Sequence, residues 1–159
     1  MRTIEVATII AAPPLEVWAV LTDFPRYPAW SAYIQELSGR AEEGARLRLV
    51  QGPPGQRPHV VDVPVIEATP GVRLAWRAVI PGAPWLPRAI FTGTHEFVLT
   101  ALADGGTELT HREYFSGLLA RMVKEGAPGG DQGFEAFNTA LKHRVEESAA
   151  VDDEAGHPA

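Results

Sequence analysis

Hydrophobic and polar residues alternate with a period of two over much of the first 116 residues, a pattern typical of β-strands with one covered face. The first such stretch covers residues 2–11. The pattern returns in six later segments, at residues 33–38, 46–51, 60–69, 72–79, 90–102 and 107–116. Glycine and proline separate these segments, and Asp104-Gly105-Gly106 is the strongest hairpin signal in the chain. We therefore expect an antiparallel sheet of about seven strands.

Helical spacing of apolar residues occurs in two other places. Residues 13–22 begin with two prolines and predict a short amphipathic helix, and the aromatic segment 24–30 predicts a second short helical turn. Near the C-terminus, Phe134, Phe137, Leu141 and Val145 recur every three or four residues. This stripe predicts one continuous helix over residues 131–147 with its apolar face against the sheet. Residues 149–159 are small and acidic, and we expect them to be disordered.

The predicted order is a strand, two short helices, a run of antiparallel strands and a closing helix, which defines one α+β domain over residues 1–148. Several segments resemble the START-like (SRPBCC) superfamily, specifically its polyketide cyclase/dehydrase and lipid-transport branch. They are TDFPRYPAW at 22–30, GTHEF at 93–97, the strand and following residues at 106–119, and FNTALK at 137–142. The resemblance implies the helix-grip fold, in which a curved antiparallel sheet wraps around the C-terminal helix and encloses an internal cavity.

Three ionisable residues are predicted to point into the interior of the sheet. In the strand at 90–102, His95 shares its face with the apolar Phe91, Phe97 and Leu99. In the next strand, His111 and Glu113 share a face with Leu109 and Phe115. The two histidines and the glutamate should therefore face one largely hydrophobic space.

This cluster has three interpretations. His95, His111 and Glu113 can form a buried polar network that only stabilises the fold. They can instead be catalytic, because an imidazole oriented by a carboxylate beside an apolar pocket can move protons on an enolisable carbonyl compound. Two histidines and a carboxylate also match an iron facial triad in composition, but the usual closely spaced histidine pair is missing, so no metal is predicted.

Aromatic and apolar residues near the expected cavity are candidates for ligand contact, with a purely structural role in the core as the alternative. Trp30 and Tyr33 should lie at the cavity mouth, and Asn138 either bonds the sheet backbone or fixes a ligand carbonyl. Trp85 and Leu86, between two prolines, predict a lid over the pocket, with a surface loop in which Trp85 packs against its own segment as the alternative. The full set of predicted ligand-binding residues is Trp30, Tyr33, Leu49, Trp76, Trp85, Leu86, Phe91, Phe97, Phe115, Phe134, Phe137, Asn138 and Leu141.

Composition narrows the possible functions. The formal net charge is −6 and no run of Lys and Arg occurs, which argues against a nucleic-acid partner. The absence of cysteine removes disulfides and thiol chemistry and fits a cytoplasmic location. No stretch is long and apolar enough for stable membrane insertion. We expect no cofactor, and a monomer or weak homodimer.

Two main functions remain. The first is binding of a hydrophobic small molecule, such as a lipid, isoprenoid or polyketide, in the internal cavity. The second is a cofactor-independent enzyme of the polyketide cyclase/dehydrase type that uses a His or Glu acid-base group in the same cavity. A third possibility is an interaction protein with a reduced pocket. The chain has no nucleophile elbow or phosphate-binding glycine loop that would indicate another enzyme class.

Overall fold

The computed structural model describes residues 2–52, 55–80, 91–117 and 131–155. Seven strands form one sheet: β1 (Arg2–Ile10), β2 (Ile34–Ser38), β3 (Arg46–Gln51), β4 (His59–Thr69), β5 (Arg73–Ile80), β6 (Phe91–Ala101) and β7 (Thr107–Ser116). The helices are α1 (Pro14–Thr22), a 3₁₀ turn η1 (Phe24–Arg26), α2 (Tyr27–Trp30) and α3 (Asp131–Ala155). The predicted strands and short helices are therefore confirmed to within a residue or two at their ends.

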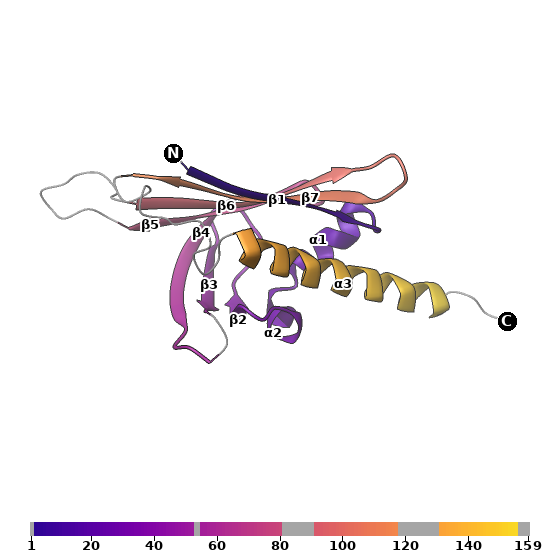
Figure 1. The fold of residues 1–159 in the computed structure, drawn as a ribbon, viewed down its shortest axis with the longest axis horizontal. Coiled ribbons are helices and arrows are strands. Elements are labelled where there is room, and N and C mark those ends of the chain that lie inside the picture. Colours follow the sequence, from indigo (N-terminus) through magenta and orange to yellow (C-terminus); the bar gives the residue numbers. More distant parts are fainter. Residues whose placement is uncertain (1, 53–54, 81–90, 118–130, 156–159) are drawn as a thin grey trace, which may run out of the picture.

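The sheet is antiparallel and open, with strand order β1-β7-β6-β5-β4-β3-β2. It curves strongly, so that β2, β3 and β4 turn away from the plane of β1, β5, β6 and β7 (Figure 1). The register shifts between Val65 and Glu67 on β4 and between Ile34 and Glu36 on β2, and irregularities of this kind bend a strand locally. The predicted hairpin at Gly105, whose φ is +88°, joins β6 to β7.

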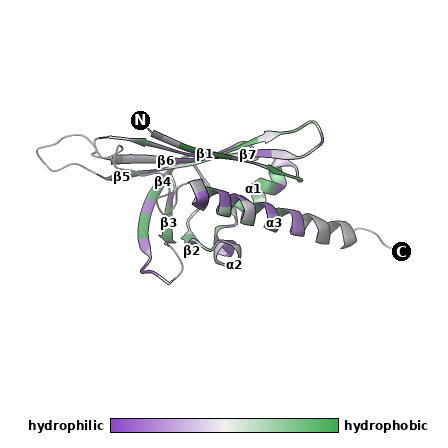
Figure 2. Cartoon of the chain, in the orientation of Figure 1, coloured by the Kyte–Doolittle hydropathy of each residue, from purple (hydrophilic) through white to green (hydrophobic). Residues whose placement is uncertain are grey.

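Helix α3 lies on the concave side of the sheet (Figure 1), which confirms the helix-grip architecture. Leu141 and Val145 are fully covered and belong to the main hydrophobic core. Two polar contacts fix the helix to the end of β1: Lys142 Nζ donates to the Ile9 carbonyl at 2.8 Å, and the Ala11 N–H donates to Glu146 at 2.9 Å. In the part of α3 that is coloured in Figure 2, hydrophilic and more hydrophobic positions alternate, as expected of a helix with one covered face.

The C-terminal end of α3 differs from the prediction. The helix continues to Ala155, about two turns beyond the predicted end at residue 147 and past the predicted domain boundary at 148. The prediction of disorder was therefore wrong for residues 149–155. Ala149 and Ala150 have high helix propensity, and no helix-breaking residue occurs before Gly156. Residues 156–159 lie outside the described part of the chain.

The two short helices are held by a buried tyrosine. The Tyr27 hydroxyl, fully covered, donates to the Leu21 carbonyl at 2.6 Å and so ties α2 to the end of α1. Burial raises the pKa of this phenol far above its usual value, so the hydroxyl stays protonated. The Tyr27 ring lies 5.9 Å from Phe137 of α3. This packing places Trp30 near the same part of α3, because its ring also contacts Phe137.

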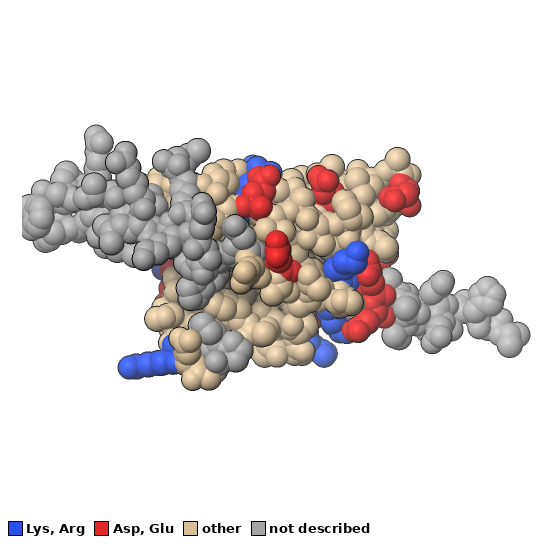
Figure 3. Space-filling model, viewed as in Figure 1, with Lys and Arg blue, Asp and Glu red and all other residues tan. Residues whose placement is uncertain are grey.

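None of the described helices is long and apolar enough to span a bilayer. Among the described residues on the face shown in Figure 3, acidic and basic side chains are scattered and do not gather into a patch of one sign.

Candidate functional site

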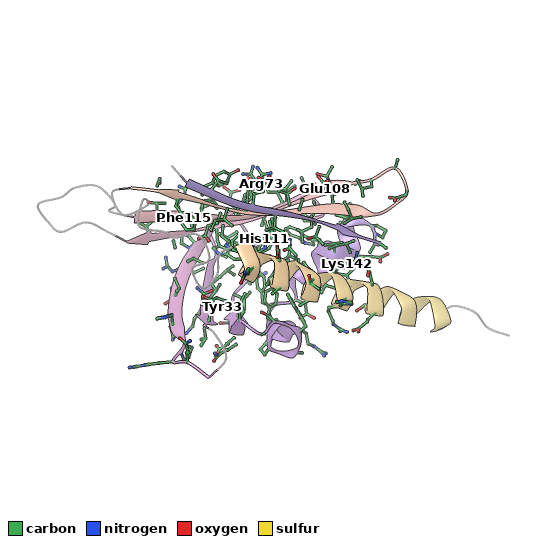
Figure 4. The ribbon with its side chains drawn as sticks, viewed as in Figure 1. Tyr33, Arg73, Glu108, His111, Phe115 and Lys142 are labelled. Carbon is green, nitrogen blue, oxygen red and sulfur yellow. The ribbon has the colours of Figure 1, made fainter. Side chains whose placement is uncertain are left out.

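Consecutive residues of β6 and β7 point to opposite faces of the sheet, which brings the predicted polar residues together on the concave side. His95 lies directly opposite Glu113 in the β6–β7 register, and His111 lies opposite Phe97. His111 projects into the layer between the sheet and α3, whereas Arg73 lies on the other side of the sheet (Figure 4). The prediction that His95, His111 and Glu113 cluster on the inner face is confirmed.

These residues belong to a longer arrangement that we call the polar chain, made of Thr8, Asn138, His111, His95 and Glu113. The Asn138 amide donates to Thr8 Oγ1 at 3.1 Å, and its carbonyl oxygen lies 2.8 Å from His111 Nδ1. His111 Nε2 lies 2.7 Å from His95 Nε2, and His95 Nδ1 lies 3.7 Å from Glu113 Oε2. The polar chain thus links β1, α3, β7 and β6.

The middle of the polar chain is buried and uncharged. His111 is 2% exposed and Asn138 is fully covered. Burial, together with the neighbouring His95, lowers the pKa of His111 well below its usual value, and the hydrogen bond to Asn138 opposes this only partly. The imidazole of His111 also stacks on Phe134, with ring centres 3.9 Å apart and planes within 6°. His111 is therefore a buried, neutral ring with both nitrogens bonded.

The His95–Glu113 end of the polar chain is accessible. Their side chains are 18% and 22% exposed, respectively. His95 stacks flat against Trp76, with ring centres 4.8 Å apart and planes within 3°. Its Nδ1 atom has no hydrogen bond to Glu113, because 3.7 Å exceeds hydrogen-bond distance. This end can therefore interact with a molecule brought to the site.

Tyr33 lies close enough to the same end to be affected by the charge of Glu113. Its pKa is raised, first by partial burial and second by the negative charge of Glu113. The hydroxyl of Tyr33 is therefore protonated at neutral pH and lies within electrostatic range of Glu113. Tyr33 and Trp30 both pack against the main core while staying partly exposed.

Aromatic rings connect Trp30 to the polar chain without interruption. Trp30 contacts Phe137 with ring centres 5.2 Å apart, Phe137 contacts Phe97 at 5.5 Å, and Phe97 contacts His95 at 5.0 Å. The Trp30 indole N–H is buried and has no hydrogen-bond acceptor among the described residues. An oxygen supplied by a ligand or by water would satisfy this donor.

The other predicted ligand-binding residues occupy several environments. Leu49, Phe97 and Leu141 are covered parts of the main core, and Trp76 is 6% exposed. Phe115 and Phe134 form a second buried group with Ile4. Trp85 and Leu86, and with them the predicted lid, lie outside the described residues, and only the backbone of Phe91 is described. Ligand contact by any of these residues, and the internal cavity itself, remain predictions.

Asn138 has a different role from either of those predicted for it. Its carbonyl and amide groups both bond side chains, His111 and Thr8, and not the sheet backbone. Sequence reasoning identified the amide in the apolar stripe but missed Thr8. The available signal was that Thr8 shares the inner face of β1 with Ile4, Val6 and Ile10.

The geometry does not suit a shared metal ion. The facing Nε2 atoms of His95 and His111 are 2.7 Å apart, which suits a direct N–H···N hydrogen bond between the two rings. Among the described residues, no group of three or more metal-ligating side chains is placed to hold a metal.

Comparison with known proteins identifies the family. Residues 1–146 match the family model for polyketide cyclase / dehydrase and lipid transport proteins, and the chain therefore belongs to that family. A comparison with curated proteins finds no match.

Solved structures with the same fold include three bacterial proteins at low sequence identity. Protein MLL2253 from Mesorhizobium loti is 20% identical, with a TM-score of 0.68 over 92% of this chain and 98% of that one. The Zhui aromatase/cyclase from Streptomyces sp. R1128 is 19% identical, with a TM-score of 0.66 over 93% and 95% of the two chains. A START superfamily protein from Mycobacterium smegmatis is 20% identical, with a TM-score of 0.64 over 91% and 97%. These likenesses show the shared fold.

Proposed function

We propose that this protein binds a hydrophobic small molecule, of lipid, isoprenoid or polyketide-like character, between α3 and the concave face of the sheet. The observation that carries the proposal is the polar chain, which runs from a sealed interior to an accessible His95–Glu113 pair surrounded by aromatic rings. A polar network needed only for folding would not have to end at an ionisable pair that is partly exposed. Family membership supports the same proposal.

The surrounding aromatic side chains suit such a ligand. Trp30, Tyr33 and Phe137 are each partly exposed and come from α2, the segment after it and α3. Their rings supply apolar contact area, while the Trp30 N–H and the Tyr33 hydroxyl supply polar contacts at its edge. The ligand would therefore lie with its apolar body against these rings and its polar end at His95 and Glu113.

Direct binding measurements test this proposal. Native mass spectrometry of protein purified without denaturation should show a co-purifying small molecule, and farnesol should quench tryptophan fluorescence in a saturable manner. Trp30→Leu should weaken farnesol binding by about tenfold, because a large aromatic contact is lost. Leu15→Ala is the matched control, because Leu15 is 64% exposed on α1. A clean apo mass together with no saturable farnesol binding would contradict the proposal.

A second candidate function, cyclase/dehydrase chemistry, rests on one specific contact. His95 Nδ1 faces the Glu113 carboxylate at 3.7 Å, an arrangement that places a proton-accepting ring nitrogen on the accessible side of the polar chain, as a general base requires. In the enolisation step, the proton on a carbon next to a carbonyl would move to Nδ1, the C–H electron pair would form the new C=C bond, and the π electron pair of the C=O bond would move onto the carbonyl oxygen.

Hydrogen exchange distinguishes this activity from binding alone. In D₂O, the wild-type protein should accelerate deuterium incorporation into 2-tetralone, a hydrophobic enolisable ketone, and His95→Gln should abolish the acceleration. Incorporation at the rate of buffer alone would leave only the binding function.

A further inference from the structure

The direction of hydrogen bonding along the polar chain determines which nitrogen of His95 carries a proton. The Asn138 carbonyl oxygen can only accept, so His111 Nδ1 must donate to it. Because His111 is neutral, its Nε2 then has a lone pair and no proton. At 2.7 Å from that lone pair, His95 Nε2 must be the donor.

The other nitrogen of His95 is consistent with this assignment. A proton on Nδ1 would have no acceptor at hydrogen-bond distance, since Glu113 Oε2 is 3.7 Å away. A proton on Nε2 has an acceptor at 2.7 Å. The neutral ring therefore keeps its proton on the buried side and presents a lone pair on the accessible side.

We propose that His111 and Asn138 are positioning residues that fix His95 in its Nε2–H form, so that Nδ1 and the Glu113 carboxylate together recognise a hydroxyl group on the bound molecule. This inference rests on the proposed binding function and goes further, because it specifies the polar end of the ligand. Nδ1 and the carboxylate are both acceptors, and a group placed against both of them must donate a hydrogen bond. A ligand whose polar end only accepts hydrogen bonds would leave two acceptors desolvated and unpaired.

Neither positioning residue can play this part by touching the ligand itself. His111 is 2% exposed and Asn138 is fully covered. The Asn138 amide is anchored in turn by Thr8 on β1, which holds its carbonyl oxygen toward His111. The contact between α3 and the sheet thus determines which nitrogen of His95 carries the proton.

The first experiment measures the proton position without any ligand. Long-range ¹⁵N–¹H correlation spectra above neutral pH distinguish a protonated ring nitrogen from a bare one, and His95→Gln and His111→Gln assign the signals. In the wild type, His95 should be protonated on Nε2 and His111 on Nδ1. The opposite pair of tautomers in the wild type would overturn the proposal, whether or not any variant folds.

The second experiment removes the positioning group. Asn138→Leu has nearly the same volume but takes away the acceptor for His111, so the His111 proton should move to Nε2 and the His95 proton to Nδ1. Thr107→Val is the matched control, because it removes another buried hydrogen bond from β7, donated to the Ala12 carbonyl at 2.6 Å, without touching the polar chain. Unchanged His95 signals in folded Asn138→Leu would overturn the positioning role.

The third experiment tests the ligand class with 2-naphthol and 2-methoxynaphthalene, which differ in whether their oxygen donates a hydrogen bond. The wild type should bind 2-naphthol about tenfold more tightly, and Asn138→Leu should lose most of this preference. Equal affinities in the wild type would overturn hydroxyl recognition while leaving hydrophobic binding intact. If neither compound binds, the result counts against the proposed binding function and against hydroxyl recognition, while the spectra still decide the positioning role.

Discussion

The two faces of the β6–β7 hairpin satisfy their polar residues in opposite ways. Moving one residue along either strand changes the face, from His95 to Glu96 on β6 and from His111 to Arg112 on β7. The convex face uses full charges in ion pairs, and the concave face uses neutral hydrogen bonds. The same two strands carry both the ion pairs and the neutral hydrogen bonds. The difference therefore reflects the surroundings of each face and not the local backbone.

On the convex face, five side chains form what we call the charge ladder: Glu5, Arg112, Glu96, Arg73 and Glu67. Arg112 lies 3.1 Å from Glu5 and 3.5 Å from Glu96, and Arg73 lies 3.1 Å from Glu67 and also pairs with Glu96. Glu96 is only 2% exposed, but its two arginine partners are 27% and 41% exposed. Water can therefore still reach the positive ends of this ladder.

On the concave face, helix α3 and the aromatic rings exclude water, and a charge at its centre would be costly. The polar chain is accordingly neutral at His111 and Asn138, and its formal charge is at the accessible Glu113. The charge ladder links strands β1, β7, β6, β5 and β4 of the sheet through ion pairs, whereas we propose that the polar chain serves the ligand site at its exposed end.

The largest expected effect is on stability, and it compares the side-chain packing of the two faces. Phe97→Ala should lower the free energy of unfolding by about 3–5 kcal/mol, because this ring is 1% exposed and contacts Trp76, His95 and Phe137. Val98→Ala, one residue along on the convex face, should cost only about 1 kcal/mol, because Val98 is half-buried. Urea unfolding of both variants measures the difference. Equal losses in the free energy of unfolding would show that the two faces are packed alike.

A smaller effect should appear in the pH dependence of stability. The pKa of His111 is lowered in the folded state, so below the ordinary histidine pKa of about 6.5 the unfolded chain binds a proton that the folded chain does not. The contribution of His111 to the stability of the folded state is therefore complete above that pH. It is lost as the pH falls from there toward the lower pKa of the folded state. His111→Gln lacks this contribution. The difference in melting temperature between wild type and His111→Gln should be flat above neutral pH and should shrink on acidification, and a constant difference would show that His111 is not buried as a neutral ring.

The alternation pattern was sufficient to predict the strands and the inner face of the sheet, whereas the helix-grip arrangement was implied by the resemblance to the START-like superfamily. Each strand carried a period of two, and the Asp104-Gly105-Gly106 turn fixed the β6–β7 pairing that brings His95 opposite Glu113. Parity along a strand decides which face a residue occupies, and this is a local property. For that reason His95, His111 and Glu113 were identifiable before the structure was known.

The connections within the site could not be predicted in the same way. The contacts of Asn138 with Thr8 and His111 depend on how α3 is rotated and translated over the sheet, and no local pattern records this. The end of α3 was also misjudged, because acidic composition at residues 149–155 outweighed the helix propensity of Ala149 and Ala150 in the prediction.

The central claim is that the inward carboxylate serves the ligand and the outward one serves the fold, and Glu113→Gln and Glu96→Gln test it as a matched pair. Each substitution keeps the side-chain shape and removes one charge, and melting temperature and 2-naphthol affinity are measured on the same samples. Glu96→Gln should cost about 1–3 kcal/mol of stability and leave the affinity of the folded protein unchanged, because the buried carboxylate is lost from two partly exposed arginines.

Glu113→Gln should leave the melting temperature nearly unchanged and weaken 2-naphthol binding by about tenfold, because the side chain is accessible and makes no short contact with His95. A large loss of stability in Glu113→Gln, with normal binding by the fraction that remains folded, would contradict the account and leave the polar chain with a structural role alone.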